Sequence, residues 1–209
     1  MMDTWPALYL AGLGAFHGLN PAMGWLFAVA LGLHRRSRAT VFAALVPIAI
    51  GHALSIAAVA ALLVTAGVLV PGSAVRIGSA LLLLAWALYH WRFGHRHRVR
   101  FGMQAGLLGL AAWSFLMATA HGAGIMLWPA LMPFCLPDSA GAGGPATPIA
   151  AASAGVGVHT LAMLTTTALV ALLVYEWAGV GVLRRAWLNM DALWTLALAA
   201  TAVLLLALR

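Results

Sequence analysis

Long apolar stretches alternate along this chain with short polar or basic connections. Six of the stretches are candidates to cross a hydrocarbon core of about 30 Å as helices. They cover approximately residues 8–33, 40–64, 77–91, 102–132, 148–175 and 187–208. This pattern predicts an all-α integral membrane protein in which residues 1–209 form one polytopic membrane domain with six transmembrane helices.

The composition agrees with the membrane assignment, and the charges predict an orientation. Hydrophobic residues make up 64% of the 209 positions and charged residues 7%, whereas soluble domains are about 25% charged. The net charge of +7 comes from eleven arginines and no lysine. Nine of the arginines follow the first, third or fifth stretch: Arg35, Arg36, Arg38, Arg92, Arg96, Arg98, Arg100, Arg184 and Arg185. Because positive loops stay in the cytoplasm, we expect both termini to lie outside. We also expect a multi-pass protein of the inner (cytoplasmic) membrane, in contact with the lipid bilayer and with no nucleic-acid partner.

Two short motifs occur once in each half of the chain. Ala-Phe-His-Gly at 15–18 is matched by Thr-Ala-His-Gly at 119–122, and Ile-Gly-His-Ala-Leu at 50–54 by Gly-Val-His-Thr-Leu at 157–161. Each half therefore has one histidine span, a second histidine span and a closing apolar span. Three spans per half reverse the polarity of the second half, so the pattern predicts a 3+3 inverted repeat, with repeat one near residues 5–100 and repeat two near 101–209.

The four matched histidines, His17, His52, His121 and His159, lie near the middle of their spans. An ionisable residue at this depth is expensive and usually functional. Four neutral imidazoles suit a transition-metal ion such as zinc, iron or copper rather than calcium or magnesium. The alternatives are a proton relay, because histidine titrates near neutral pH, and hydrogen bonding that only holds helices together.

Helix breakers and small polar residues accompany these histidines. Asn-Pro at 20–21, Pro47 with Gly51, Pro129, and Gly155 with Gly157 predict that all four histidine spans are interrupted near mid-membrane. Candidates to orient a histidine or to contact a substrate are Asn20, Ser55 and Thr160. Asn20 has the alternative role of capping the kink at Pro21, and in span one it shares a helical face with His17. Most of the tryptophans lie near span ends and indicate interfacial belts.

The six spans, the inverted halves and the His-Gly elements resemble the LysE-type superfamily of small transporters, which includes nickel/cobalt exporters. The resemblance covers nearly the whole chain at the level of architecture. It implies that His17 and His121, the histidines of the first and fourth spans, are metal contacts. The Asp-His pair typical of nickel/cobalt permeases is missing, and so is the cysteine pair of the thiol-redox members.

Two classes of function follow from the sequence. The first is a transporter, or metal-binding membrane protein, that handles a transition-metal ion at a four-histidine site, with proton-coupled export of a solute without metal as a variant. The second is an intramembrane metalloenzyme acting on an apolar substrate. An enzyme of this kind usually needs a general acid or base beside the metal, and the spans lack a mid-depth acid. A subunit whose histidines hold haem for a partner complex is a further alternative.

Overall fold

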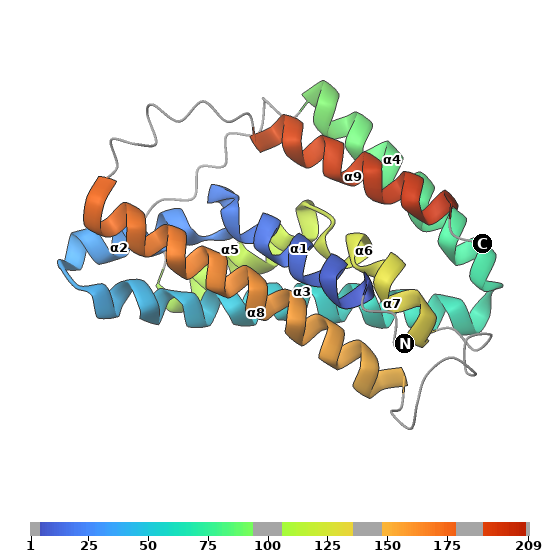
Figure 1. The fold of residues 1–209 in the computed structure, drawn as a ribbon, viewed down its shortest axis with the longest axis horizontal. Coiled ribbons are helices and arrows are strands. Elements are labelled where there is room, and N and C mark those ends of the chain that lie inside the picture. Colours follow the sequence, from blue (N-terminus) through green and yellow to red (C-terminus); the bar gives the residue numbers. More distant parts are fainter. Residues whose placement is uncertain (1–4, 94–105, 136–147, 179–189, 208–209) are drawn as a thin grey trace.

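The computed structural model describes residues 5–93, 106–135, 148–178 and 190–207, which are almost entirely helical (Figure 1). The elements are, in order, α1 Trp5–Leu19, η1 Pro21–Met23, α2 Trp25–Arg35, α3 Arg38–Leu69, α4 Gly72–Phe93, α5 Leu107–Ala120, α6 Ala123–Met126, α7 Trp128–Cys135, α8 Pro148–Leu173, η4 Val174–Ala178 and α9 Met190–Ala207. The all-α class is therefore confirmed. Arg96, Arg98, Arg100, Arg184, Arg185 and most of the loop that precedes α8 lie outside the described residues.

Three helices are long and apolar enough to cross a membrane. They cover Arg38–Leu63, Gly72–Phe93 and Ala152–Trp177, while Leu107–Ala120 and Ala192–Ala207 are shorter apolar helices. Many large apolar side chains in these helices are exposed, as expected where lipid replaces water. The membrane assignment is thus supported by three candidate spans among the described residues, while the prediction of six spans is not confirmed.

The first and fourth predicted spans are interrupted, as their sequences indicated. Helix α1 ends before Asn20, a 3-10 turn follows, and α2 begins after Gly24, whose φ of 125° strongly favours glycine. In the second half, α5 ends before His121, and Gly122 enters the left-handed region with a φ of 72°. Because α1 ends at Leu19, His17 lies in this helix while Asn20 lies beyond its end, and the two residues do not share one helical face.

The second and fifth spans differ from the expectation. Helix α3 continues through Pro47 and Gly51, and α8 continues through Gly155 and Gly157. The prediction of breaks there is wrong. Proline is tolerated inside a membrane helix when neighbouring groups meet the freed backbone, and α3 is packed closely against α5. The Ser114 hydroxyl of α5 donates to the Ile48 carbonyl at 2.8 Å and so joins the two helices near Pro47, although the carbonyl that Pro47 itself frees is that of Ala43.

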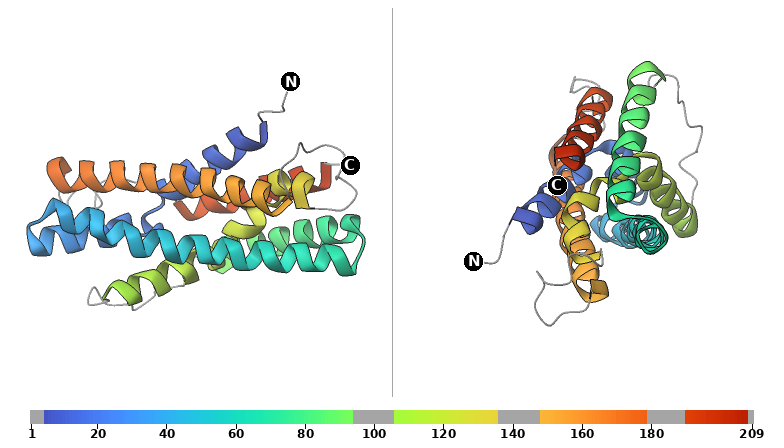
Figure 2. Two further views of the ribbon diagram at one scale, coloured as in Figure 1. Left: turned by 90° about the horizontal axis from the view of Figure 1, so that it is seen from below. Right: turned by 90° about the vertical axis from the view of Figure 1, so that its right-hand side faces the viewer.

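Three pairs of helices make the most extensive contacts: α1 with α8, α3 with α5, and α4 with α9. Helices α1, α3, α5 and α8 form the main bundle, while α4 and α9 lie side by side along one edge of it (Figures 1 and 2). Helices α2 and α3 also pack together, as do α7 and α8. Glycines permit the closest approaches, with Gly14 against the His159 carbonyl and Gly51 against the Ala111 carbonyl.

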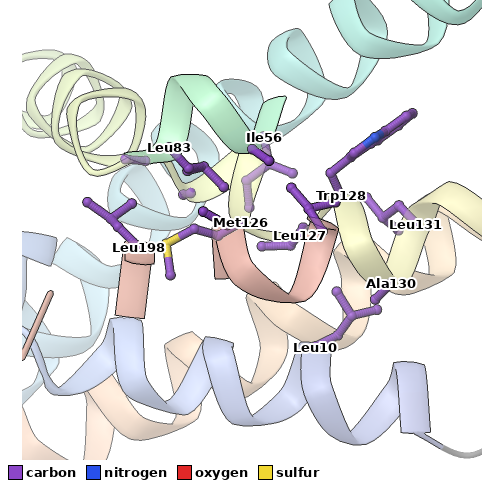
Figure 3. Close-up of a cluster of buried hydrophobic side chains, with 14 of the residues drawn as sticks. Leu10, Ile56, Leu83, Met126, Leu127, Trp128, Ala130, Leu131 and Leu198 are labelled. Carbon is purple, nitrogen blue, oxygen red and sulfur yellow. The ribbon is translucent and has the colours of Figure 1, made fainter. Parts of the chain in front are cut away.

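An apolar core joins the edge pair to the main bundle. Figure 3 shows side chains of α1, α3, α4 and α9 gathered around the short helices α6 and α7. Met126, Leu127 and Trp128 in this core are almost fully buried. The interrupted span is thus enclosed by other helices, which is the condition under which irregular backbone is tolerated within a membrane.

Candidate functional site

Three of the four predicted histidines meet inside the main bundle. His17 from α1, His52 from α3 and His159 from α8 are all completely buried. The ring centroid of His17 lies 5.6 Å from that of His52 and 4.9 Å from that of His159. The His52 and His159 rings are almost parallel, and their Nε2 atoms are 3.2 Å apart. We refer to His17, His52 and His159 as the inner site.

Backbone carbonyls fix the tautomers of two of these rings. His17 Nδ1 lies 2.8 Å from the Leu13 oxygen, and His159 Nδ1 lies 3.2 Å from the Leu10 oxygen. A carbonyl only accepts, so both Nδ1 atoms carry the proton and both Nε2 atoms carry the lone pair in the neutral ring. His52 Nε2 then donates to His159 Nε2. His17 Nε2 and His52 Nδ1 are buried without a hydrogen-bond partner.

This pattern is the one that metal-binding histidines usually show, with one ring nitrogen donating to a carbonyl and the other presenting its lone pair. Two nitrogens bound at about 2.0 to 2.1 Å to one tetrahedral ion lie about 3.3 Å apart, close to the 3.2 Å between His52 and His159. Among the described residues, however, no three His, Cys, Asp or Glu side chains are already arranged to hold a metal ion. Binding therefore requires movement from this conformation.

The fourth predicted histidine, His121, contacts a tryptophan that also contacts the inner site. Its ring is 4.9 Å from the indole of Trp194, and that indole is 4.6 Å from His17. His121 Nδ1 donates to the Met117 oxygen at 2.7 Å, so its Nε2 also carries the lone pair when the ring is neutral. The His121 ring is 6.0 Å from that of His90 in α4.

The three predicted accessory residues have different environments. Asn20 is buried, and its Oδ1 accepts from the Ala22 amide at 3.0 Å, so its role as a cap is confirmed. The Ser55 and Thr119 hydroxyls are 2.8 Å apart and join α3 to α5. Thr160 Oγ1 is buried without a hydrogen-bond partner in the described part of the chain.

Four tryptophan indoles serve the two broken spans, which the sequence did not indicate. Trp25 and Trp113 donate to the carbonyls of Leu19 and Ala22 at 3.0 and 3.2 Å. In the second half the donors are Trp86, at 2.6 Å from the Ala120 oxygen, and Trp194, at 3.0 Å from the His121 oxygen. The indoles thus satisfy carbonyls that a helix break leaves open. The expectation of an interfacial belt is wrong for Trp25 and Trp194, which are buried.

Comparison with protein-family profiles, curated proteins and solved structures finds no match for this chain. The resemblance to the LysE-type superfamily therefore stays a prediction based on sequence motifs and span order. Function has to be inferred from the site itself.

Proposed function

We propose that the protein transports a transition-metal ion across the membrane, with the imidazoles of His17, His52 and His159 as the buried site through which the ion passes. The observation that carries this proposal is the convergence of three fully buried histidines from three helices. Independent helix-holding contacts would not require the three rings to lie within 4.9 to 5.6 Å of one another. Glu176, whose carboxylate the structure describes, pairs with Arg38 rather than with these rings, so an ion that accepts nitrogen ligands, such as zinc, iron or copper, fits best.

The helix pairing supports an inverted repeat for this transporter. An inverted repeat relates α1 to α5, α3 to α8 and α4 to α9. This exchange turns the α1–α8 pair into the α5–α3 pair and leaves the α4–α9 pair unchanged, in agreement with the observed contacts. The two broken helices are exchanged as well, each with its own pair of capping indoles. Inverted repeats with discontinuous helices at the site are typical of carriers that work by alternating access. We expect the movement of the histidines that metal binding requires to be part of such an alternating-access change.

The orientation of the proposed repeat is directly testable. In a Cys135→Ser background, we expect single cysteines at Arg36, Arg96 and Arg184 to react with a membrane-impermeant thiol reagent only from the cytoplasmic side. A cysteine at Asp138 is the matched control and should react only from the opposite side. Labelling of position 96 from outside would overturn both the topology and the inverted repeat.

Metal content tests the proposed cargo. The protein, purified without chelator and equilibrated with zinc, iron or copper salts, should retain about one ion per chain by elemental analysis. Vesicles containing the protein should then accumulate the retained ion down its gradient faster than empty vesicles. His34→Ala is the control, because His34 is an exposed histidine on α2 away from the inner site, and it should change neither result.

A proton relay is the second candidate function, favoured by the hydrogen bond between His52 and His159. Imidazoles linked in this way can pass a proton, since each ring has one donor and one acceptor nitrogen. Absence of metal above background in the purified protein would reject the metal proposal. Proton entry into vesicles that hold a pH indicator, lost in His52→Ala, would then support the relay.

A further inference from the structure

The Trp194 ring contacts histidines of both halves of the chain, His17 and His121. The indole is almost completely buried and lies nearly perpendicular to both imidazoles, with interplanar angles of 88° and 81°. It therefore contacts both the inner site and His121.

A second pair of imidazoles lies beyond this indole. His121 faces His90 on α4, two residues before Arg92, at the helix end that the arginine pattern predicts to be cytoplasmic. The rings of Trp86 and Tyr89 lie 5.7 and 6.1 Å from His90. Aromatic faces attract cations, so this outer pair, His90 and His121, has the chemistry of a cation entry or exit point.

An apolar groove lies beside α9; Trp194 does not line it, but its neighbours Leu193 and Phe16 do. This groove of about 450 Å³ separates part of α9 from α1, with Leu13 and Phe16 on one wall and Leu193 and Ala197 on the other. In Figure 1, α9 lies with α4 at the edge of the bundle. The Trp194 indole itself is held by its hydrogen bond to the His121 carbonyl and by stacking on Phe16 at 5.3 Å.

We propose that Trp194 is a gate between the inner site and the outer pair, and that movement of α9 toward the groove opens it for the metal cation. This inference rests on the proposed transport function and adds to it a path, an outer pair and the residue that closes the path. Closure by Trp194 would keep the inner site from being open to the cytoplasm, which is what alternating access requires.

The test measures access to the inner site from each side of the membrane, without using metal. A single cysteine is placed at His17 in a Cys135→Ser background and treated with a charged, membrane-impermeant thiol reagent in inside-out and right-side-out vesicles. With Trp194 intact, labelling should be slow from the cytoplasmic side. Trp194→Ala should accelerate it on the order of tenfold, equivalent to about 1.4 kcal/mol of barrier, and only from that side.

Three variants separate a gate from general loosening. Trp194→Phe keeps an aromatic ring and should remain closed. Trp113→Ala removes an indole that caps the other helix break and should leave cytoplasmic labelling at position 17 unchanged. If Trp194→Ala does not accumulate, Trp194→Leu fills the space without a flat ring and should open the site in the same way.

Unchanged labelling, or an equal increase from both sides, would overturn the gate. This outcome is distinct from failure of the proposed function, which would be absence of bound metal in the protein with all its histidines present. Retained metal together with unchanged labelling would reject the gate alone.

Discussion

Replacing Gly51 by valine is expected to prevent the protein from folding, the largest effect of any single change considered. A Cβ atom at Gly51 would overlap the carbonyl oxygen of Ala111 and come within 2.9 Å of the Ala111 carbonyl carbon and the Phe115 nitrogen. These are backbone atoms, so no change of rotamer relieves the overlap. Helices α3 and α5 would have to move apart.

Separation of α3 from α5 would also disrupt specific polar contacts. The bonds from Ser114 to the Ile48 carbonyl and between Ser55 and Thr119, both 2.8 Å, cross this interface. His52, next to Gly51, would be displaced from the inner site. Since a membrane helix pair is held by close packing and hydrogen bonds rather than by the hydrophobic effect, little remains to compensate for their loss.

A smaller substitution makes this prediction quantitative. Gly51→Ala introduces the same Cβ overlap without the further atoms of valine, so it should lower the free energy of unfolding by at least the ~1 to 3 kcal/mol that overpacking usually costs. The matched control is Gly157→Ala in α8, where a Cβ would meet nothing within 4 Å; this change should be neutral or slightly stabilising because alanine favours helix. Unfolding in detergent followed by circular dichroism compares the two, and equal stability would contradict the close approach.

The second large effect is expected on metal affinity. His17→Ala, His52→Ala and His159→Ala should each weaken binding by more than about 100-fold, because even an outer partner of a metal ligand contributes about 10- to 100-fold. Each variant should still fold, since one polar contact between membrane helices is worth about 0.6 to 2 kcal/mol. Titration of the purified protein with the ion it retains, with helicity measured in parallel, gives both quantities.

His121→Ala distinguishes three ligands from four. The span order predicts a four-nitrogen site, whereas the proposed gate, Trp194, contacts both His17 and His121 and would hold them apart when closed. We therefore expect His121→Ala to keep most of the bound metal but to slow transport, because it removes half of the outer pair. Loss of metal equal to that in His17→Ala would restore the four-histidine site and would require a conformation in which Trp194 has moved aside.

The position of the His52 proton is the reason we expect ion binding at the inner site to be coupled to a movement of His52. In the described conformation the His52 Nε2 proton points to His159 Nε2. An ion that takes both Nε2 lone pairs requires this proton to move to His52 Nδ1, which is buried and has no partner. Ion binding would thus replace the hydrogen bond between His52 and His159 by two bonds from their Nε2 atoms to the ion. The ion-free and ion-bound states would then differ in what holds the His52 ring.

The sequence by itself determined the class of protein and most helix positions. Apolar stretches predict helices because every backbone polar group in lipid needs an internal partner, and this requirement is local. Asn20 with Pro21 likewise predicted a break after His17, because a cap and a missing amide act on their own helix. The same reasoning failed at Pro47 and Gly51, where contact with α5 keeps α3 continuous.

Only the tertiary structure decided which histidines share a site. Repeat symmetry made His17, His52, His121 and His159 equivalent candidates, but three of them converge, while the ring of His121 contacts Trp194. The use of four indoles to satisfy the broken helices was equally hidden, because each bonds a carbonyl whose position depends on where helices cross. Those crossings are set by interhelical packing at glycines such as Gly14 and Gly51. A residue's own sequence neighbours do not specify its partner on another helix, so the clustering of the three histidines exists only in the folded protein.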